Sequence, residues 1–327
     1  MAAACCAADS VIHLLFTGGT ISMQYDAVAG GNVPTHAGEA LLALAPGAAA
    51  VAPCRVENWA RIPACHLTQA DHWRLRERVR ELSADPVVQG IVVTHGTDTL
   101  EETAYLLDRT LGGATPVVCT GAMRTSDHAE WDGARNLTDA IRVAAAEATR
   151  GRGVQVVFGG RIWQGHEAVK VDTVALDAFG SPFGAQRGTV TDHVVYASSA
   201  RPSSVVDLRD LRAQVALVPM VIGDKGVLLD AVRDAHDGVV IEAFGSGNLP
   251  PGAVPAIGRW LTEGKPVVLS SRCAAGQVSP VYAFEGGGAR TVAMGALPAG
   301  PRTPSQARWE LTIALSAGVP YASGLTA

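Results

Sequence analysis

The chain has 327 residues, of which 48% are hydrophobic and 17% charged, and its formal net charge is −5 with a sequence pI near 6.0. This composition excludes a disordered or fibrous protein, and it provides no basic surface that would attract nucleic acid or an anionic membrane. We therefore expect a globular protein whose partner is a small molecule, and the length favours two domains.

Short apolar runs rich in Val, Ile and Leu recur along the chain, and most are separated by stretches with helical periodicity. Buried strands that alternate with helices are typical of an α/β fold whose sheet is mostly parallel. The sequence therefore predicts an α/β fold. The predicted strands lie at residues 11–16, 91–93, 116–119, 154–158, 239–243 and 266–269.

Three helix starts are marked by capping patterns, in which a threonine and a polar residue three positions later satisfy the first amides of a helix. The patterns are Thr68-x-x-Asp71, Thr99-x-x-Glu102 and Thr303-Pro-x-Gln306.

A loop-rich segment between residues 180 and 212 predicts the domain boundary. It contains Ser181-Pro182, Arg187-Gly188 and Arg201-Pro202, which favour turns over regular structure. We expect a larger N-terminal catalytic α/β domain and a smaller C-terminal α/β domain joined by a linker. The predicted ranges are 1–190 for the first domain, 191–212 for the linker and 213–327 for the second domain.

The cysteines show no C-x-x-C pair and no metal-ligand spacing, so they are predicted to be reduced thiols. The start of the chain lacks a signal-peptide pattern, and no run of about 18 apolar residues occurs that would predict a membrane span. A cytoplasmic location is expected. The six cysteines are Cys5, Cys6, Cys54, Cys65, Cys119 and Cys273.

Hydroxyl residues and glycines directly follow several predicted strands. Since the carboxyl ends of parallel strands meet at one edge of a sheet, these residues are expected to form one polar pocket. The alternative is that Thr and Gly are simply common at strand ends and helix caps. The segments are Thr17-Gly18-Gly19-Thr20, Thr94-His95-Gly96-Thr97-Asp98, Thr120-Gly121-Ala122-Met123, Gly245-Ser246-Gly247-Asn248 and Ser270-Ser271-Arg272.

Three other chemistries are not supported by these segments. The Thr17–Thr20 segment lacks the Gly-Lys-Ser/Thr ending of a phosphate-binding loop, and no Gly-x-Ser-x-Gly occurs for a serine hydrolase. The nine histidines show no H-E-x-x-H or paired ligand spacing. We expect neither a metal nor another cofactor.

Two of the segments resemble the signatures of the asparaginase/glutaminase family. They are Thr17-Gly18-Gly19-Thr20-Ile21 and the run from His95 to Ala104, and the second match is highly specific. The resemblance spans nearly the whole chain. It continues through Thr120–Arg124, Asp132-Gly133, Asn136-Leu137, Lys170, Ala178–Pro182 and Gly247–Leu249.

The resemblance implies an amidohydrolase with an active site between the subunits of a homodimer or homotetramer. It implies attack by Thr17 to form an acyl-enzyme, and a second unit made of Thr97, Asp98 and Lys170. Lys170 is one of three lysines in the chain. A lysine held near Asp98 in a partly buried pocket can accept a proton from Thr97 or water. Asp98 is also placed to cap the following helix.

The resemblance further implies a mobile lid whose tyrosine activates the first threonine, and Tyr25 is the candidate. It places Gly96, Ala122 and Asn248 among the substrate-binding residues. An acid from the second subunit meets the substrate amino group in the family, and Glu285 is the candidate here. His95 is expected to be structural.

One loop departs from the family pattern. Family members bind the α-carboxylate of the substrate with a serine followed by glutamine or serine, whereas Ala64-Cys65 occupies these positions. A site that loses such donors loses discrimination for the charged group. Either Arg61 or His66 replaces them, or the true substrate lacks a free α-carboxylate.

The leading hypothesis is hydrolysis of L-asparagine, or a related side-chain amide, to the acid and ammonia. The alternatives are a hydrolase of a modified amide without a free α-carboxylate and a noncatalytic binding protein on the same fold. The amide-hydrolysing subunit of a tRNA-dependent amidotransferase is disfavoured, because such subunits carry an extra N-terminal domain for which the residues before the first strand leave no room.

Overall fold

The computed structural model describes residues 10–197 and 204–323, and the chain divides into two compact units between Val205 and Val206. Each unit has its own sheet. Cys5, Cys6 and the Arg201-Pro202 pair lie outside the described residues. The other four cysteines are free thiols, as predicted.

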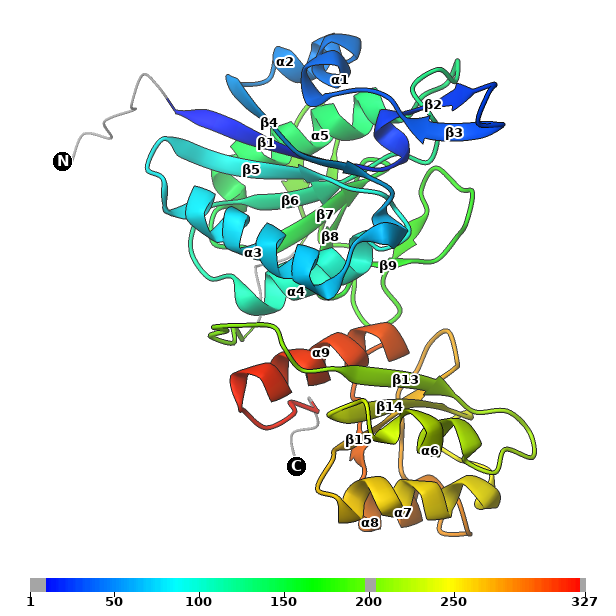
Figure 1. The fold of residues 1–327 in the computed structure, drawn as a ribbon. Helices are drawn as coiled ribbons and strands as arrows, with labels where there is room; N and C mark the ends of the chain where they lie inside the picture. Colours follow the sequence, from blue (N-terminus) through cyan, green and yellow to red (C-terminus); the bar gives the residue numbers. More distant parts are fainter. Residues whose placement is uncertain (1–9, 198–203, 324–327) are drawn as a thin grey trace, which may run out of the picture. The chain divides into compact units, whose positions relative to one another are not determined.

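The N-terminal unit is built on one eight-stranded sheet with the order β12-β11-β8-β7-β6-β5-β1-β4 (Figure 1). Five neighbouring strands, β7, β6, β5, β1 and β4, are parallel to one another. β8, β11 and β12 extend the sheet with antiparallel pairs. The strand bounds are β1 Val11–Gly18, β4 Cys54–Ile62, β5 Val88–Thr94, β6 Val117–Thr120, β7 Val154–Phe158, β8 Arg161–Gln164, β11 Gly188–Val190 and β12 Val194–Tyr196.

Helices cover both faces of this sheet, as Figure 1 shows for α1, α2 and α5 on one side and α3 and α4 on the other. The central strands are therefore apolar on both faces: along β1, Leu14 packs toward the first group and Leu15 toward the second. The helices are α1 Gly38–Leu44, α2 Pro46–Ala49, α3 Gln69–Ala84, α4 Leu100–Thr110 and α5 Gly133–Ala145.

Two small hairpins stand beyond the carboxyl ends of the parallel strands (Figure 1). One pairs β2 (Met23–Asp26) with β3 (Gly31–Pro34), and the other pairs β9 (Val169–Lys170) with β10 (Phe179–Gly180). This edge of the sheet therefore carries additional chain on which a site can be built.

The C-terminal unit contains a four-stranded parallel sheet in the order β13-β14-β15-β16. One face packs on α6, α7 and α8 around Trp260, which is fully buried, and the other packs on α9. The bounds are β13 Val215–Pro219, α6 Val227–Arg233, β14 Gly238–Ala243, α7 Val254–Thr262, β15 Val267–Ser271, α8 Gly288–Ala293, β16 Leu297–Pro298 and α9 Pro304–Ala317.

The predicted α/β fold is confirmed, and all six predicted strands fall on observed ones. The capping boxes at Thr68 and Thr303 are also confirmed. The capping prediction for Thr99 is wrong. Its hydroxyl forms no cap hydrogen bond and instead donates to the carbonyl oxygen of Ala64 at 3.2 Å, so it ties the helix start to a neighbouring loop.

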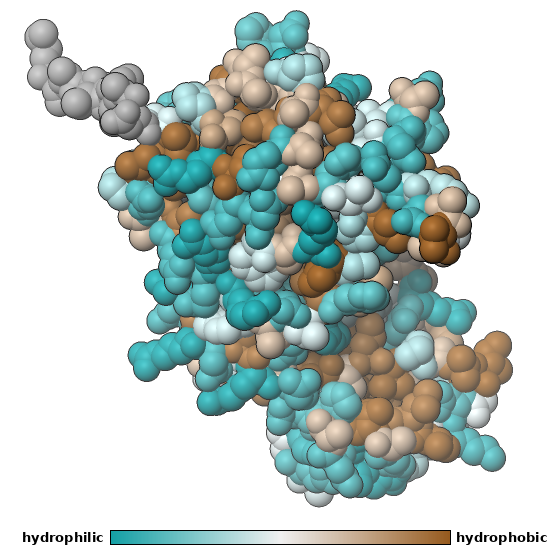
Figure 2. All heavy atoms as spheres, turned by 45° about the horizontal axis from the view of Figure 1, so that its top comes forward, coloured by the Kyte–Doolittle hydropathy of each residue, from teal (hydrophilic) through white to brown (hydrophobic). Residues whose placement is uncertain are grey.

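Apolar residues gather on part of the surface of the C-terminal unit, in the lower half of Figure 2. Ile222 of this unit is 92% exposed, and with Phe244 and Leu249, among others, it lines a groove of about 390 Å³. Within the described residues, no helix combines the length and the apolar character needed to cross a membrane.

Substitution Leu14→Ala tests the core of the N-terminal unit. Leu14 is fully buried between β1 and the α1, α2 and α5 layer, so the cavity left behind is expected to lower the free energy of unfolding by about 2–5 kcal/mol. Urea denaturation measures this change. Val28→Ala, at a fully exposed position, is the control, and equal midpoints for the two variants would contradict the assigned core.

Candidate functional site

Glycines let the turns after β1, β5 and β6 pack against one another. Gly19 has φ of 84°, and a Cβ atom on it would lie 2.4 Å from the Cα of Gly96. A Cβ on Gly96 would lie 2.6 Å from the Cβ of Ala64, and one on Gly121 would lie 2.4 Å from the carbonyl oxygen of His95. Larger residues would force these turns apart.

Lys170 joins two of the predicted site residues. Its Nζ atom donates to Oγ1 of Thr97 at 2.9 Å and to Oδ1 of Asp98 at 2.8 Å. Thr97 is buried and Asp98 is exposed, so the ammonium group spans the boundary between protein and solvent. Three of the predicted residues are thus in direct contact.

An open pocket of about 480 Å³ borders this group. Its lining consists of Asp98, Glu101, Lys170, Val171, Asp172 and Thr173. The sequence did not single out Glu101, whose Oε2 atom accepts a hydrogen bond from the backbone amide of Lys170 at 2.6 Å. The pocket is rich in charged groups, and its size suits an amino-acid-sized ligand.

Thr17 and Thr20, at the two ends of the Thr-Gly-Gly-Thr turn, differ in accessibility. Thr17 lies inside β1, is 2% exposed, and its hydroxyl donates to the carbonyl oxygen of Thr94 at 2.8 Å. Thr20 begins a short 3-10 helix, is half-buried, and its hydroxyl has no hydrogen bond to any described residue. An attacking hydroxyl must reach its substrate, and of these two hydroxyls the one on Thr20 is the more accessible.

Tyr25 lies on β2 in the hairpin predicted as a lid, and 61% of its surface is exposed. Its backbone amide donates to Oδ2 of Asp127 at 3.0 Å. The phenol has no hydrogen bond to a described residue. The structure therefore places Tyr25 at the carboxyl edge of the sheet without joining it to either threonine.

The Ala64-Cys65 loop is a 3-10 helix, Ala64–His66, that contacts the turn after β5. Ala64 is buried against Gly96, whereas the thiol-bearing Cys65 is exposed. His66 is exposed as well. Arg61 lines a different, smaller pocket of about 220 Å³, together with Gly18, Ser22, His36, Asn58, Ala60 and Phe16.

The remaining predicted binding residues are divided between the units. Ala122 is fully buried after β6 in the N-terminal unit. Asn248 and Glu285 belong to the C-terminal unit. Asn248 accepts a hydrogen bond from the amide of Gly288 at 3.2 Å, and Glu285 is exposed in a turn.

His95 is fully buried in the turn after β5, and burial lowers its pKa to about 4. Its Nδ1 atom lies 2.9 Å from the carbonyl oxygen of Gly96, and its Nε2 atom lies 2.9 Å from the hydroxyl of Thr103. A neutral ring that donates from Nδ1 and accepts at Nε2 satisfies both contacts. The contacts support the structural role expected for His95.

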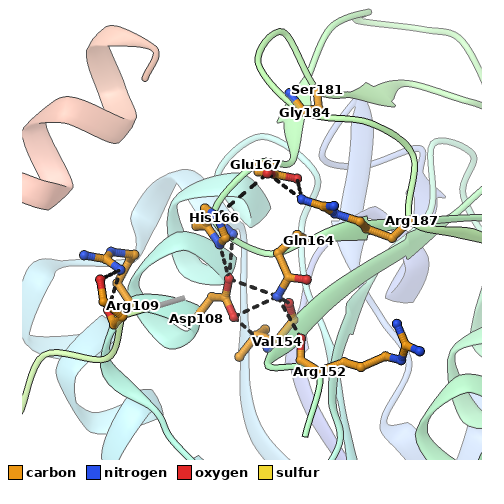
Figure 3. A network of polar contacts seen from close by, with 11 residues as sticks. Asp108, Arg109, Arg152, Val154, Gln164, His166, Glu167, Ser181, Gly184 and Arg187 are labelled. Carbon is orange, nitrogen blue, oxygen red and sulfur yellow. Dashed lines mark hydrogen bonds and ion pairs between the residues drawn. The ribbon is translucent and has the colours of Figure 1, made fainter. Parts of the chain in front are cut away.

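A buried carboxylate that the sequence did not reveal anchors the chain before Lys170. Figure 3 shows this group, Asp108, among its polar partners. Asp108 on α4 is fully buried and accepts from the amide of Val154 at 2.8 Å. Its other oxygen lies 2.5 Å from Nδ1 of His166 and accepts from the amide of that residue at 3.1 Å. The Gln164 side chain donates to both carboxylate oxygens.

An ion pair between Arg187 and Glu167 continues this network, and Figure 3 shows these two side chains next to each other. Arg187 donates to the two carboxylate oxygens of Glu167, each at 2.7 Å. Residues 164–167 are thereby fixed to α4 and to the segment before β11. Because Lys170 follows three residues later, the network restrains its strand. Within the described residues, no cluster of His, Cys, Asp or Glu has a geometry that could hold a metal ion.

Substitution Asp108→Asn is expected to lower the free energy of unfolding by about 3 kcal/mol. The asparagine side chain has an NH₂ group in place of one carboxylate oxygen. This donor would face a buried backbone N–H that donated a hydrogen bond to the carboxylate, so that hydrogen bond would be lost. Urea denaturation measures the change. Glu147→Gln, whose side chain is 87% exposed, is the control and should change stability by less than about 0.5 kcal/mol. A loss equally small in Asp108→Asn would argue against the network.

The chain matches two family models, "Asparaginase, N-terminal" over residues 11–202 and "Glutaminase/Asparaginase C-terminal domain" over residues 214–323. It is 40% identical to a probable L-asparaginase of Deinococcus radiodurans over 79% of this chain and 80% of that one. It is 33% identical to L-asparaginase 2 of Bacillus subtilis, over 82% and 74% of the two chains. The crystal structure of a probable cytoplasmic L-asparaginase from Campylobacter jejuni superposes with a TM-score of 0.83, at 29% identity and over 94% of this chain and 95% of that one. The chain therefore belongs to the asparaginase family.

Proposed function

We propose that this protein hydrolyses the side-chain amide of L-asparagine, or of a closely related compound, to the acid and ammonia. The observation that carries the proposal is the contact of Lys170 with both Thr97 and Asp98 beside an open polar pocket. Similarity to proteins named L-asparaginase supports this substrate.

In this proposal the hydroxyl of Thr20 attacks the amide carbon. The hydroxyl proton is transferred to the leaving nitrogen, which departs as ammonia, and a threonine ester remains on the enzyme. Water then attacks the ester, releases the acid and restores Thr20. Lys170, when its amine is neutral, accepts a proton from Thr97 or from water, and Asp98 holds the lysine in place.

Other parts of the proposal rest on the family resemblance. Tyr25 activates the attacking threonine, Thr20, when its hairpin closes, and Glu285 and Asn248 contact substrate bound to a second subunit. A homodimer or homotetramer is part of the proposal, and the exposed apolar groove of the C-terminal unit is consistent with it. A cytoplasmic location agrees with the description of the Campylobacter jejuni relative.

Ammonia release from purified protein tests the reaction. L-asparagine, D-asparagine, L-glutamine and amides with an absent or blocked α-carboxylate are compared. Thr20→Val and Lys170→Met are each expected to lower kcat by about 10²-fold or more, because each removes a group that acts in the transition state. Thr17→Val is the matched control. It should keep most of its activity and lose about 1 kcal/mol of stability, since its hydroxyl donates to the backbone carbonyl of Thr94.

If Thr17→Val lost its amidase activity while Thr20→Val remained active, the attacking hydroxyl would be that of Thr17. Absence of ammonia release from all amides would favour a noncatalytic binding protein.

Ala64 and Cys65 favour a second substrate class, amides without a free α-carboxylate. Restoring the usual donors by Ala64→Ser with Cys65→Gln is expected to raise kcat/KM for L-asparagine about tenfold, because a charged carboxylate gains hydrogen-bond partners. Steady-state kinetics measures the effect. Cys273→Ser, at another exposed cysteine, is the control. Unchanged kinetics in the double variant would argue against a lost carboxylate site.

A further inference from the structure

Glu101 presents a carboxyl group to the backbone of the catalytic lysine. It lies in the first turn of α4, three residues after Asp98, and Oε2 accepts the amide hydrogen of Lys170 at 2.6 Å. Such a short distance is typical of a hydrogen bond to an ionised acceptor, which is about twice as strong as a neutral one. The contact spans 69 residues of sequence and connects two separate elements.

The strand that carries Lys170 needs external support. β9 contains only Val169 and Lys170. Among the described strands it pairs only with the equally short β10, in the register Phe179 to Lys170 and Gly180 to Val169. A two-residue ladder provides little stability by itself. Glu101 fixes this strand at Lys170, and the network around Asp108 fixes the chain before it.

The surroundings of Glu101 shift the pKa of its carboxyl group in opposite directions. Burial raises the pKa of its carboxyl to about 7, and the neighbouring charge of Glu102 acts in the same direction. The hydrogen bond from the Lys170 amide and the positive charge of Lys170 act in the opposite direction. Asp98 and Asp172 line the same pocket. Both the acid and the carboxylate are therefore populated near neutral pH.

We propose that Glu101 is a positioning residue that acts through Lys170. Its carboxylate holds the main chain of Lys170 so that the ammonium group reaches both Thr97 and Asp98, and protonation of Glu101 loosens that hold. Below about pH 7 the neutral acid accepts the amide hydrogen more weakly, and Lys170 spends less time between its two partners. The consequence for kcat rests on the proposed amidohydrolase function, but the consequence for the Lys170 backbone does not.

The three lysines of the chain make a direct test practicable. Protein labelled with ¹⁵N only at lysine gives amide signals from Lys170, Lys225 and Lys265, and Lys225→Arg and Lys265→Arg assign them. The Lys170 signal is expected to shift with pH with a midpoint near 7. The other two, which belong to the C-terminal unit, are internal references.

Glu101→Gln is expected to abolish the titration of the Lys170 amide. Glu102→Gln is the matched control one residue along the same helix turn, and it should keep the titration with a slightly lower midpoint, because a like charge is removed. If Glu101→Gln fails to fold, Glu101→Asp serves instead, since the shorter side chain should move the midpoint. A titration that persists unchanged in the Glu101 variant, or no titration of Lys170 between pH 5.5 and 8.5 in the wild type, would overturn the proposal.

Kinetics adds a readout that a purely structural role would not change. The wild-type kcat should fall below about pH 7, whereas Glu101→Gln should show a flat profile with kcat reduced about tenfold at pH 8. If kcat of Glu101→Gln were lower at every pH but still fell below about pH 7, Glu101 would contribute only to the stability of the fold. Inactivity of the wild type towards every amide would reject the amidohydrolase function and leave the NMR test of Glu101 intact.

Discussion

Close packing of main chain at Gly19, Gly96 and Gly121 is the constraint on which the site depends. Each of these residues leaves no room for a Cβ atom, so the turns after β1, β5 and β6 approach one another without intervening side chains. Thr20 and Thr97 each directly follow one of these glycines. The parallel sheet brings the turns to one edge, and the glycines allow the proposed catalytic hydroxyls to lie close to the backbone.

The elements that could be predicted from sequence are those buried on both faces. Continuous apolar runs such as 91–93, short and rich in β-branched residues, favour core strands, and the structure agrees. The sequence does not predict β4 because it is an edge strand without a buried residue, in which Arg55, Asn58 and Arg61 are exposed at every third position and give no strand alternation. β11 and β12 were missed because three-residue strands leave no periodic signal. Their pairing depends on distant residues.

The candidate site was predictable as a set of residues but not as a geometry. Lys170 lies 72 residues from Asp98, and only the family resemblance connected them before the fold was known. Thr17 and Thr20 both border the Gly18-Gly19 pair, and the family resemblance implied Thr17, whereas the burial of Thr17 within β1 favours Thr20. Glu101 looks like an ordinary acid at a helix start. Its orientation toward β9 is a tertiary contact that no local pattern contains.

Burial has opposite effects on His95 and Glu101, and the two effects offset each other in the pH dependence of folding. The pKa of His95 falls from 6.5 to about 4, so the unfolded chain binds the extra proton between these values and acid destabilises the fold. The pKa of Glu101 rises from 4.5 to about 7, so there the folded chain binds the extra proton and acid stabilises it. Between pH 4.5 and 6.5 the two slopes have opposite signs and similar size. In this window both groups are neutral in the folded protein, and together they leave the free energy of unfolding nearly constant.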